Sequence, residues 1–202
     1  HVRPYGITVA PGGGLPAVSQ FSVATGSSEW SVVYEFARYY GGVSPRFDRE
    51  GRLVLTGWEG GQERLVDDSV PLIALVRRDK RYGVLSQVLV RDRWSGAVEK
   101  VDNRDFVSAG GRARRVITMP ERSTYKSMRY SGQFQLDKSA SELRRMEVTV
   151  GQPFWAWPGD LVAVRRRGLD WNGTYRAVQV TVGMDGGGCW SRLELADPDF
   201  TV

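Results

Sequence analysis

One stretch near the start of the chain has the apolar spacing of an amphipathic helix. In GSSEWSVVYEFARYYGG the apolar positions recur three, four and seven residues apart, which places them on one helical face. These positions are Trp30, Val33, Tyr34 and Ala37. Ser28 is a good N-cap, and Gly41-Gly42 supplies a stop. The pattern predicts a helix at about 28–40, and VSPRF-DREG-RLVLTG predicts a hairpin at about 43–56.

After residue 70 the pattern changes to short runs of alternating or β-branched residues. DLVAVRR, GTYRAVQVTVG and WSRLELAD read as strands, with turns expected at Asn172-Gly173 and Gly186–Gly188. The Ser139 to Glu142 spacing of a capping box predicts one short helix at about 139–146. Short strands with frequent turns are typical of a small antiparallel barrel.

These patterns predict an α+β fold that is mainly β, and they divide the chain into three parts. Residues 1–14 are expected to be the end of an N-terminal β segment, in which YGITVAP is a strand. Residues 15–70 would form a compact helix–hairpin module. Residues 71–202 would form a barrel-like domain.

The charge of the chain is unevenly distributed. Its 202 residues have a net charge of +5, of which residues 1–70 contribute −2 and residues 71–202 contribute +7. Arginine outnumbers lysine 24 to 4, and arginine pairs with carboxylates of a protein partner as readily as with phosphates. The second part of the chain is therefore suited to an anionic partner.

Several kinds of chemistry lack their usual residues. The one histidine is His1 and the one cysteine is Cys189, so a Ser-His-Asp triad, a Cys/His zinc site and an intrachain disulfide are not expected. No Walker loop is present, and no apolar run approaches the roughly 20 residues of a membrane-spanning helix. We expect no catalytic residue, metal, cofactor or membrane anchor, although a pair of carboxylates would suffice for a glycosidase-type hydrolase.

Tryptophan and arginine are concentrated in residues 151–195. Stacking aromatic rings and basic side chains bind single-stranded nucleic acid, so a nucleic-acid-binding barrel module is one hypothesis. The alternative is that these residues fill a barrel or anchor a protein interface. The side chains concerned are Trp155, Trp157, Trp171, Trp190 and Arg165–Arg167.

The order of the motifs resembles that of a known family. A helix and the hairpin GVSPRFDREGRLVLTG are followed much later by PGDLVAV, GTYRAVQVTVGMDGGGCWSRLEL and DPDF. This order is similar to that of baseplate hub proteins of contractile-tailed phages, of the phage Mu type, and of the hub part of VgrG-like injection-system spikes. The likeness runs from about Gly26 to Phe200. Two features depart from the family pattern. The family's further N-terminal barrel segment has no counterpart in this sequence, and the arginine-rich stretches 77–81 and 112–115 match no motif of the family.

The resemblance implies a structural protein rather than an enzyme. A hub joins the tail tube to the spike and to other baseplate proteins as a homotrimer, within a virion tail made in the bacterial host cytoplasm, and DNA passes through it at most transiently. The residues expected to build the barrel or its interfaces are Trp157, Pro158, Gly159, Asp160, Arg166, Trp171 and Trp190. The other hypotheses are the nucleic-acid-binding module and, less favoured, a tail-associated cell-wall hydrolase.

Overall fold

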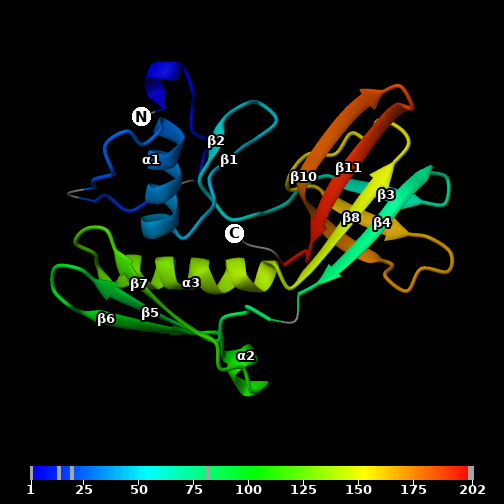
Figure 1. The fold of residues 1–202 in the computed structure, drawn as a ribbon. Helices are drawn as coiled ribbons and strands as arrows, with labels where there is room; N and C mark the ends of the chain where they lie inside the picture. Colours follow the sequence, from blue (N-terminus) through cyan, green and yellow to red (C-terminus); the bar gives the residue numbers. More distant parts are fainter. Residues whose placement is uncertain (1, 13–14, 19–20, 81, 200–202) are drawn as a thin grey trace. The chain divides into compact units, whose positions relative to one another are not determined.

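The computed structural model describes residues 2–12, 15–18, 21–80 and 82–199, and Figure 1 shows its helices and strands. The fold is α+β and mainly β, as predicted. The helical elements are η1 (Arg3–Tyr5), α1 (Glu29–Phe36), the π-helical turn η2 (Ala37–Gly41), α2 (Arg104–Ser108) and α3 (Tyr125–Ser141). The strands are β1 (Arg46–Phe47), β2 (Leu53–Val54), β3 (Glu63–Asp67), β4 (Leu72–Asp79), β5 (Gln87–Asp92), β6 (Val98–Asp102), β7 (Arg114–Met119), β8 (Arg144–Val150), β9 (Leu161–Arg165), β10 (Gly173–Asp185) and β11 (Gly188–Ala196).

The chain forms two compact units, each made of two chain segments. The mixed unit contains the chain up to Gly57 and Gly83–Ala140, and the barrel unit contains Trp58–Tyr82 and the chain from Ser141 onward. These segments do not coincide with the contiguous parts 15–70 and 71–202 suggested by the sequence. The difference arises because β4 and β8, which lie far apart in the chain, pair with each other in one sheet.

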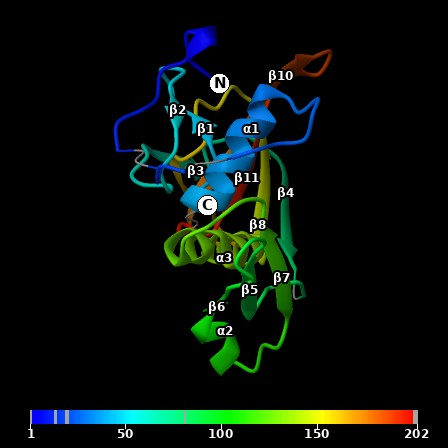
Figure 2. The same ribbon diagram turned by 90° about the vertical axis from the view of Figure 1, so that its left-hand side faces the viewer.

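In the mixed unit, α3 packs on the three-stranded sheet β6-β5-β7, and Figure 2 shows these elements from a second direction. Val88, Val90, Met128 and Leu136 are among its fully buried residues. A Cβ on Gly132 of α3 would lie 2.6 Å from Cγ2 of Val101, so glycine allows the helix to approach the sheet. The predicted short helix at 139–146 is wrong: α3 ends at Ser141, and β8 already begins at Arg144.

Ser139 explains that error. Its hydroxyl donates to the carbonyl oxygen of Leu136 and accepts from the backbone N–H of Leu85, so it does not cap a new helix. The actual N-cap is Thr124, whose Oγ1 accepts from the backbone N–H of Ser127.

The predicted first helix is present with its expected cap. Ser28 Oγ accepts from the backbone N–H of Ser31, and the helical segment stops at Gly42, whose φ is 67°. The predicted apolar stripe is only partly right, because Trp30 is 42% exposed and stacks on Phe47. The buried face instead runs through Val32, Ala37 and Tyr40.

The N-terminal segment 5–11 forms a bridge rather than the expected strand. Val9 pairs in parallel with Leu53, through hydrogen bonds from Ala10 N to Leu53 O and from Leu53 N to Thr8 O, both of 2.8 Å. The run Gly12–Gly14 was expected to end this segment, and of these residues Gly13 and Gly14 lie outside the described part of the chain.

The barrel unit is a curled six-stranded sheet of order β3-β9-β10-β11-β8-β4. Although β3 and β4 stand at the two ends of this order, a turn of only a few residues joins them, so the sheet curls until its end strands meet at that turn (Figure 1). All neighbouring strands are antiparallel except β3 and β9, which are parallel. The interior holds fully buried Val66, Val148, Val162, Leu193 and Leu195.

The two turns predicted in this region have different outcomes. The β10–β11 turn is tight, since Asp185 pairs with Gly188, as expected from Gly186–Gly188. The turn expected at Asn172-Gly173 is instead the end of a longer loop between β9 and β10. Asn172 closes that loop by accepting from Arg166 N and donating to Arg166 O.

Candidate functional site

The Trp157–Asp160 segment is a tight turn that leads into β9. Asp160 N donates to Trp157 O over 2.9 Å. Pro158 and Gly159 occupy its central positions, where a fixed negative φ and then a positive φ are favoured, and Gly159 has a φ of 102°. A Cβ at Gly159 would also lie 3.1 Å from the ring of Trp58. Both conformation and space therefore select glycine there.

The carboxylate of Asp160 fastens this turn to the start of β3. It is 3% exposed. Oδ1 accepts from Gln62 N at 3.0 Å, Oδ2 accepts from Trp157 N at 2.9 Å, and Arg64 Nε lies 3.7 Å from Oδ2. Hydrogen bonds to an ionised acceptor are stronger than neutral ones. One side chain thus joins two strand starts that are far apart in sequence.

Arg176 of β10 completes the same contact region with backbone carbonyls. Its Nη1 donates to Gly60 O and Gly159 O, both at 2.9 Å, and its Nε donates to Pro198 O at 3.2 Å. Burial lowers the pKa of Arg176 from its ordinary value. Arg176 was not among the residues predicted from the sequence, although a charge within the apolar strand GTYRAVQV is a signal for a buried polar contact.

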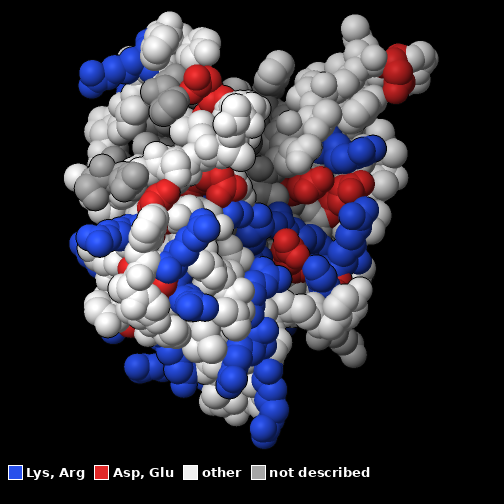
Figure 3. Space-filling model, turned by 60° about the vertical axis from the view of Figure 1, so that its left-hand side comes forward, with Lys and Arg blue, Asp and Glu red and all other residues white. Residues whose placement is uncertain are grey.

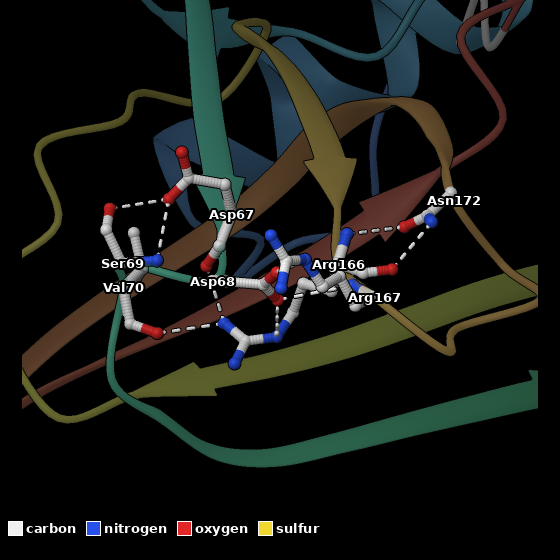
Figure 4. A network of polar contacts seen from close by, with 7 residues as sticks. All are labelled: Asp67, Asp68, Ser69, Val70, Arg166, Arg167 and Asn172. Carbon is white, nitrogen blue, oxygen red and sulfur yellow. Dashed lines mark hydrogen bonds and ion pairs between the residues drawn. The ribbon is translucent and has the colours of Figure 1, made fainter.

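Arg166 holds the β3–β4 turn, as Figure 4 shows. Its Nη1 donates to Asp67 O at 2.6 Å and to Val70 O at 2.8 Å, which are the two ends of that turn. Arg167, by contrast, has a side chain that is 98% exposed. Because β9 ends at Arg165 and the next two side chains differ in this way, Arg165–Arg167 do not form one flat basic patch.

The carboxylate of Asp67 shapes the same turn from inside (Figure 4). Oδ1 accepts from both the hydroxyl and the backbone N–H of Ser69. These donors, the hydroxyl first, lower the pKa of Asp67 from its ordinary value. Asp68 faces the other way and accepts from Arg167 N at 3.2 Å.

Trp171 lies at the edge of the barrel core and lines a cavity of about 160 Å³. The guanidinium of Arg77 is 5.3 Å from the centre of its ring, and Tyr175 donates its hydroxyl hydrogen to Trp171 O. Arg144 and Asp197 also line the cavity, so it carries both charges. This mixed lining favours no single class of small ligand.

Trp190 stiffens the β10–β11 hairpin. Its Nε1 donates to Asp185 Oδ2 at 2.9 Å, and Arg192 lies over its ring at 5.5 Å. The ring covers Gly183, where a Cβ would come within 2.4 Å of Cζ2 of Trp190. Trp190 therefore acts within the hairpin, whereas Trp155 and Trp157 are 75% and 42% exposed.

Basic side chains spread over much of the face drawn in Figure 3, with acidic side chains among them. In the barrel unit many of them are paired. Arg77 contacts Asp79 and Lys80 contacts Glu142, each at 2.9 Å. The excess of positive charge is thus partly neutralised locally.

The part of the chain that the structure describes contains no group of three or more His, Cys, Asp or Glu side chains that could hold a metal ion. None of the helices in the described ranges is long and apolar enough to cross a bilayer. Cys189 is a free, half-buried cysteine opposite Met184 in the hairpin.

Similarity to known proteins is found in the three-dimensional structure and not in the sequence. No family model matches the chain, and no curated protein matches its sequence. The crystal structure of a tail protein from Neisseria meningitidis MC58 matches with a TM-score of 0.74 and 14% identity, over 98% of this chain and 66% of that one. The 43 kDa tail protein of prophage MuSo2 from Shewanella oneidensis matches with a TM-score of 0.70 and 17% identity, over 100% of this chain and 64% of that one. The chain therefore shares its fold with these two proteins.

A third structure agrees with the first two. The prophage tail protein gp18 from Listeria monocytogenes EGD-e matches with a TM-score of 0.55 and 11% identity, over 96% of this chain and 60% of that one. This chain therefore spans about two-thirds of the length of the first two proteins, or slightly less. At such low identity the likeness establishes the fold, while function depends on particular surfaces.

Proposed function

We propose that this chain is a structural protein of a phage-type tail, and that it acts as the hub joining the tail tube to the spike and baseplate. The observation that carries the proposal is the match to two tail proteins over 98% and 100% of the chain, with TM-scores of 0.74 and 0.70. The order of the sequence motifs, which resembles that of Mu-type hubs, supports the narrower role of hub.

The barrel unit has the mechanical properties that such a role requires. Asp160, Arg166 and Arg176 each bind the backbone of a segment far away in the chain, and displacing any of them breaks at least two hydrogen bonds. A charged group held by several partners is costly to displace from a buried position. A rigid unit of this kind suits a structural component of a tail.

In the proposed assembly the chain is a homotrimer in a virion tail, built in the bacterial host cytoplasm. Its partners are the tail tube, the spike and other baseplate proteins, with DNA passing transiently and without a cofactor. The exposed rings of Trp155 and Trp157 provide the large apolar anchors typical of protein interfaces. Trp171 and Trp190 support the barrel and the hairpin behind such an interface.

Native mass measured by light scattering, at several protein concentrations and two salt levels, tests the oligomer. Three chain masses that persist at high salt are expected for a closed ring. A negative-stain image of the same sample should then show threefold particles. Monomers at every concentration would remove the trimer from the proposal.

Titration with a fluorescent single-stranded oligonucleotide tests the competing nucleic-acid hypothesis, which the exposed Trp155 and Trp157 keep open. The hub proposal predicts weak binding that salt abolishes. Submicromolar affinity that falls at least tenfold in Trp157→Ala would favour a single-strand-binding module instead. Trp94→Ala is the matched control, because Trp94 is 63% exposed in the mixed unit.

A further inference from the structure

The β10–β11 hairpin projects beyond the strands that flank it. β9 pairs with β10 only over Gly173–Arg176, and the backbone of Ala177 is bound by Gly159 and Asp160. From Gln179 to Asp185, β10 pairs in regular register with β11 alone. No hydrogen bond joins the backbone of this stretch to another segment within the described ranges. We call Gln179–Met184 the β10 overhang.

The composition of the overhang is unusual for a free strand edge. Natural proteins protect free edges with charged residues, proline or bulges, because an unprotected edge pairs with other chains. The overhang reads QVTVGM and contains no charged residue. The described edge strands β3, β6 and β7 carry several charges each, in ERLVD, VEKVD and RRVITM. An edge without such protection is expected to be covered in the working assembly.

The overhang also presents apolar side chains on a stiff support. Val182 is 44% exposed and Met184 is 82% exposed. Trp190 packs on the opposite face of the hairpin, over Gly183, and is bound to Asp185. A strand held in one conformation before binding loses less entropy when it binds.

A second edge without charged residues lies in the same unit. β4 is the end strand of the sheet, and its first half, Leu72–Val76, has no charged residue. Its register is shifted between Leu72 and Ala74, which leaves Ile73 63% exposed, and Val76 is 41% exposed. Charged residues begin only at Arg77. We call Leu72–Val76 the β4 outer edge.

We propose that the β10 overhang of one copy of this chain docks against the β4 outer edge of the next copy. This inference rests on the proposed function, since it names the contact that builds the hub. Because the two surfaces differ, the contact is heterologous, and it closes a ring of three copies when three equal rotations complete one turn. Docking would cover Val182 and Met184 with Ile73 and Val76, and would give the unpaired backbone of β10 a neighbour.

Disulfide trapping tests the pairing in a Cys189→Ser background, which removes the native thiol. Val182→Cys and Ile73→Cys proteins are unfolded, mixed in equal amounts, refolded together so that trimers contain both chains, and oxidised mildly. A covalent dimer is expected in the mixture and in neither protein alone. Val182→Cys mixed with Leu65→Cys is the matched control, because Leu65 is 50% exposed on the other end strand and should not crosslink.

A charged residue placed on the β10 overhang tests the same contact without a crosslinking reaction. Met184→Lys should fold normally, because Met184 is 82% exposed, and should weaken association at least tenfold by light scattering. Leu65→Lys, with a comparable change on β3, should assemble like the native protein. Circular dichroism of both variants separates misfolding from loss of contact.

The remaining outcomes overturn the inference. A covalent dimer of Val182→Cys alone would mean that two overhangs pair with each other. A native trimer without the mixed crosslink, or one that Met184→Lys leaves intact, would reject this contact while leaving the proposed hub standing. A protein that is monomeric at every concentration would reject both the contact and the trimer.

Discussion

Two regions of the barrel unit differ in whether their backbone groups are hydrogen-bonded by other parts of the unit. At the two ends of the parallel β3–β9 pair, side chains bind the backbone of neighbouring turns: Asp160 at the start of the pair and Arg166 at the β3–β4 turn. At the β10 overhang, one backbone edge and the side chain of Met184 are left exposed. The first region stabilises the unit from within, whereas we propose that the second contacts a neighbouring copy. Arginine-rich and tryptophan-rich composition alone does not separate these two uses.

The largest effect is expected from removing the carboxylate of Asp160. Asp160→Ala leaves the backbone N–H groups of Gln62 and Trp157 without their acceptor in a buried site, which should lower the free energy of unfolding by about 3 kcal/mol. Urea denaturation monitored by tryptophan fluorescence measures the change. Asp170→Ala, at an exposed position, should change stability by less than about 0.5 kcal/mol. Equal effects of the two changes would contradict the role given to Asp160.

Neighbouring arginines sharpen the same contrast. Arg166→Ala removes the donor that joins Asp67 O to Val70 O and should lower the free energy of unfolding by about 2 kcal/mol. Arg167→Ala should alter it by less than about 0.5 kcal/mol, because that side chain is 98% exposed. Thermal unfolding of both variants in one buffer provides the comparison. If Arg167→Ala were the more damaging change, the turn would not depend on Arg166.

Within the hairpin a smaller effect is expected from Gly183→Ala. The added Cβ would lie 2.4 Å from Trp190, so the ring must move away and its hydrogen bond to Asp185 is weakened. The free energy of unfolding should fall by about 1 kcal/mol. Hydrogen exchange of the hairpin amides should quicken, with little change at the β3–β4 turn. Gly186→Ala is the control, since nothing lies within 4 Å of its Cβ position and its φ is not positive.

The smallest effect is a pH dependence at Asp67. Because Ser69 lowers the pKa of this carboxyl in the folded protein, Asp67 stabilises the fold above the ordinary aspartate pKa of about 3.9. That contribution is lost as the pH falls through the lowered folded-state value. Asp67→Asn should therefore unfold at a slightly lower temperature than the native protein at pH 7, and the difference should shrink below pH 4. A difference that grew in acid would contradict this sign.

Local signals in the sequence were sufficient for part of the fold. Ser28 and Gly42 bound the first helix as predicted, and the Gly186–Gly188 turn closes the last hairpin. The mainly β character follows from the β-branched runs. These features depend on residues that are close in the chain.

Features that depend on distant residues were missed. α3 contains Gly132 and many polar residues, and its helical form is favoured by packing against Val101 of the sheet rather than by its own pattern. The parallel pairings of β3 with β9 and β5 with β7 have no local signal. Neither does the division of the barrel unit between two chain segments.

The candidate site divides in the same way. Gly159 follows a proline, a pair that favours a turn for local reasons, and it has a φ of 102°. The partners of Asp160 and Arg166 were not recognisable from the sequence, because Gln62 and the Asp67–Val70 turn lie almost a hundred residues away in the chain. Arg64 and Arg176 were overlooked for the same reason.

The pairing of β4 with β8 has a consequence for synthesis on the ribosome. β4 and β8 are paired up to a hydrogen bond from Lys80 N to Leu143 O, and the 83–140 segment lies between them in the chain. β3 and β4 are therefore synthesised first, and their sheet can form only after the 83–140 segment and β8 have also emerged. During that interval the apolar run LIALV of β4 has no partner strand within its own unit. Contacts between distant residues form slowly, and unpaired strands are prone to aggregate. Yield in a fast-translating, warm expression host should therefore fall more steeply than equilibrium stability would indicate, and slower synthesis or a chaperone that shields nascent β-strands should restore it.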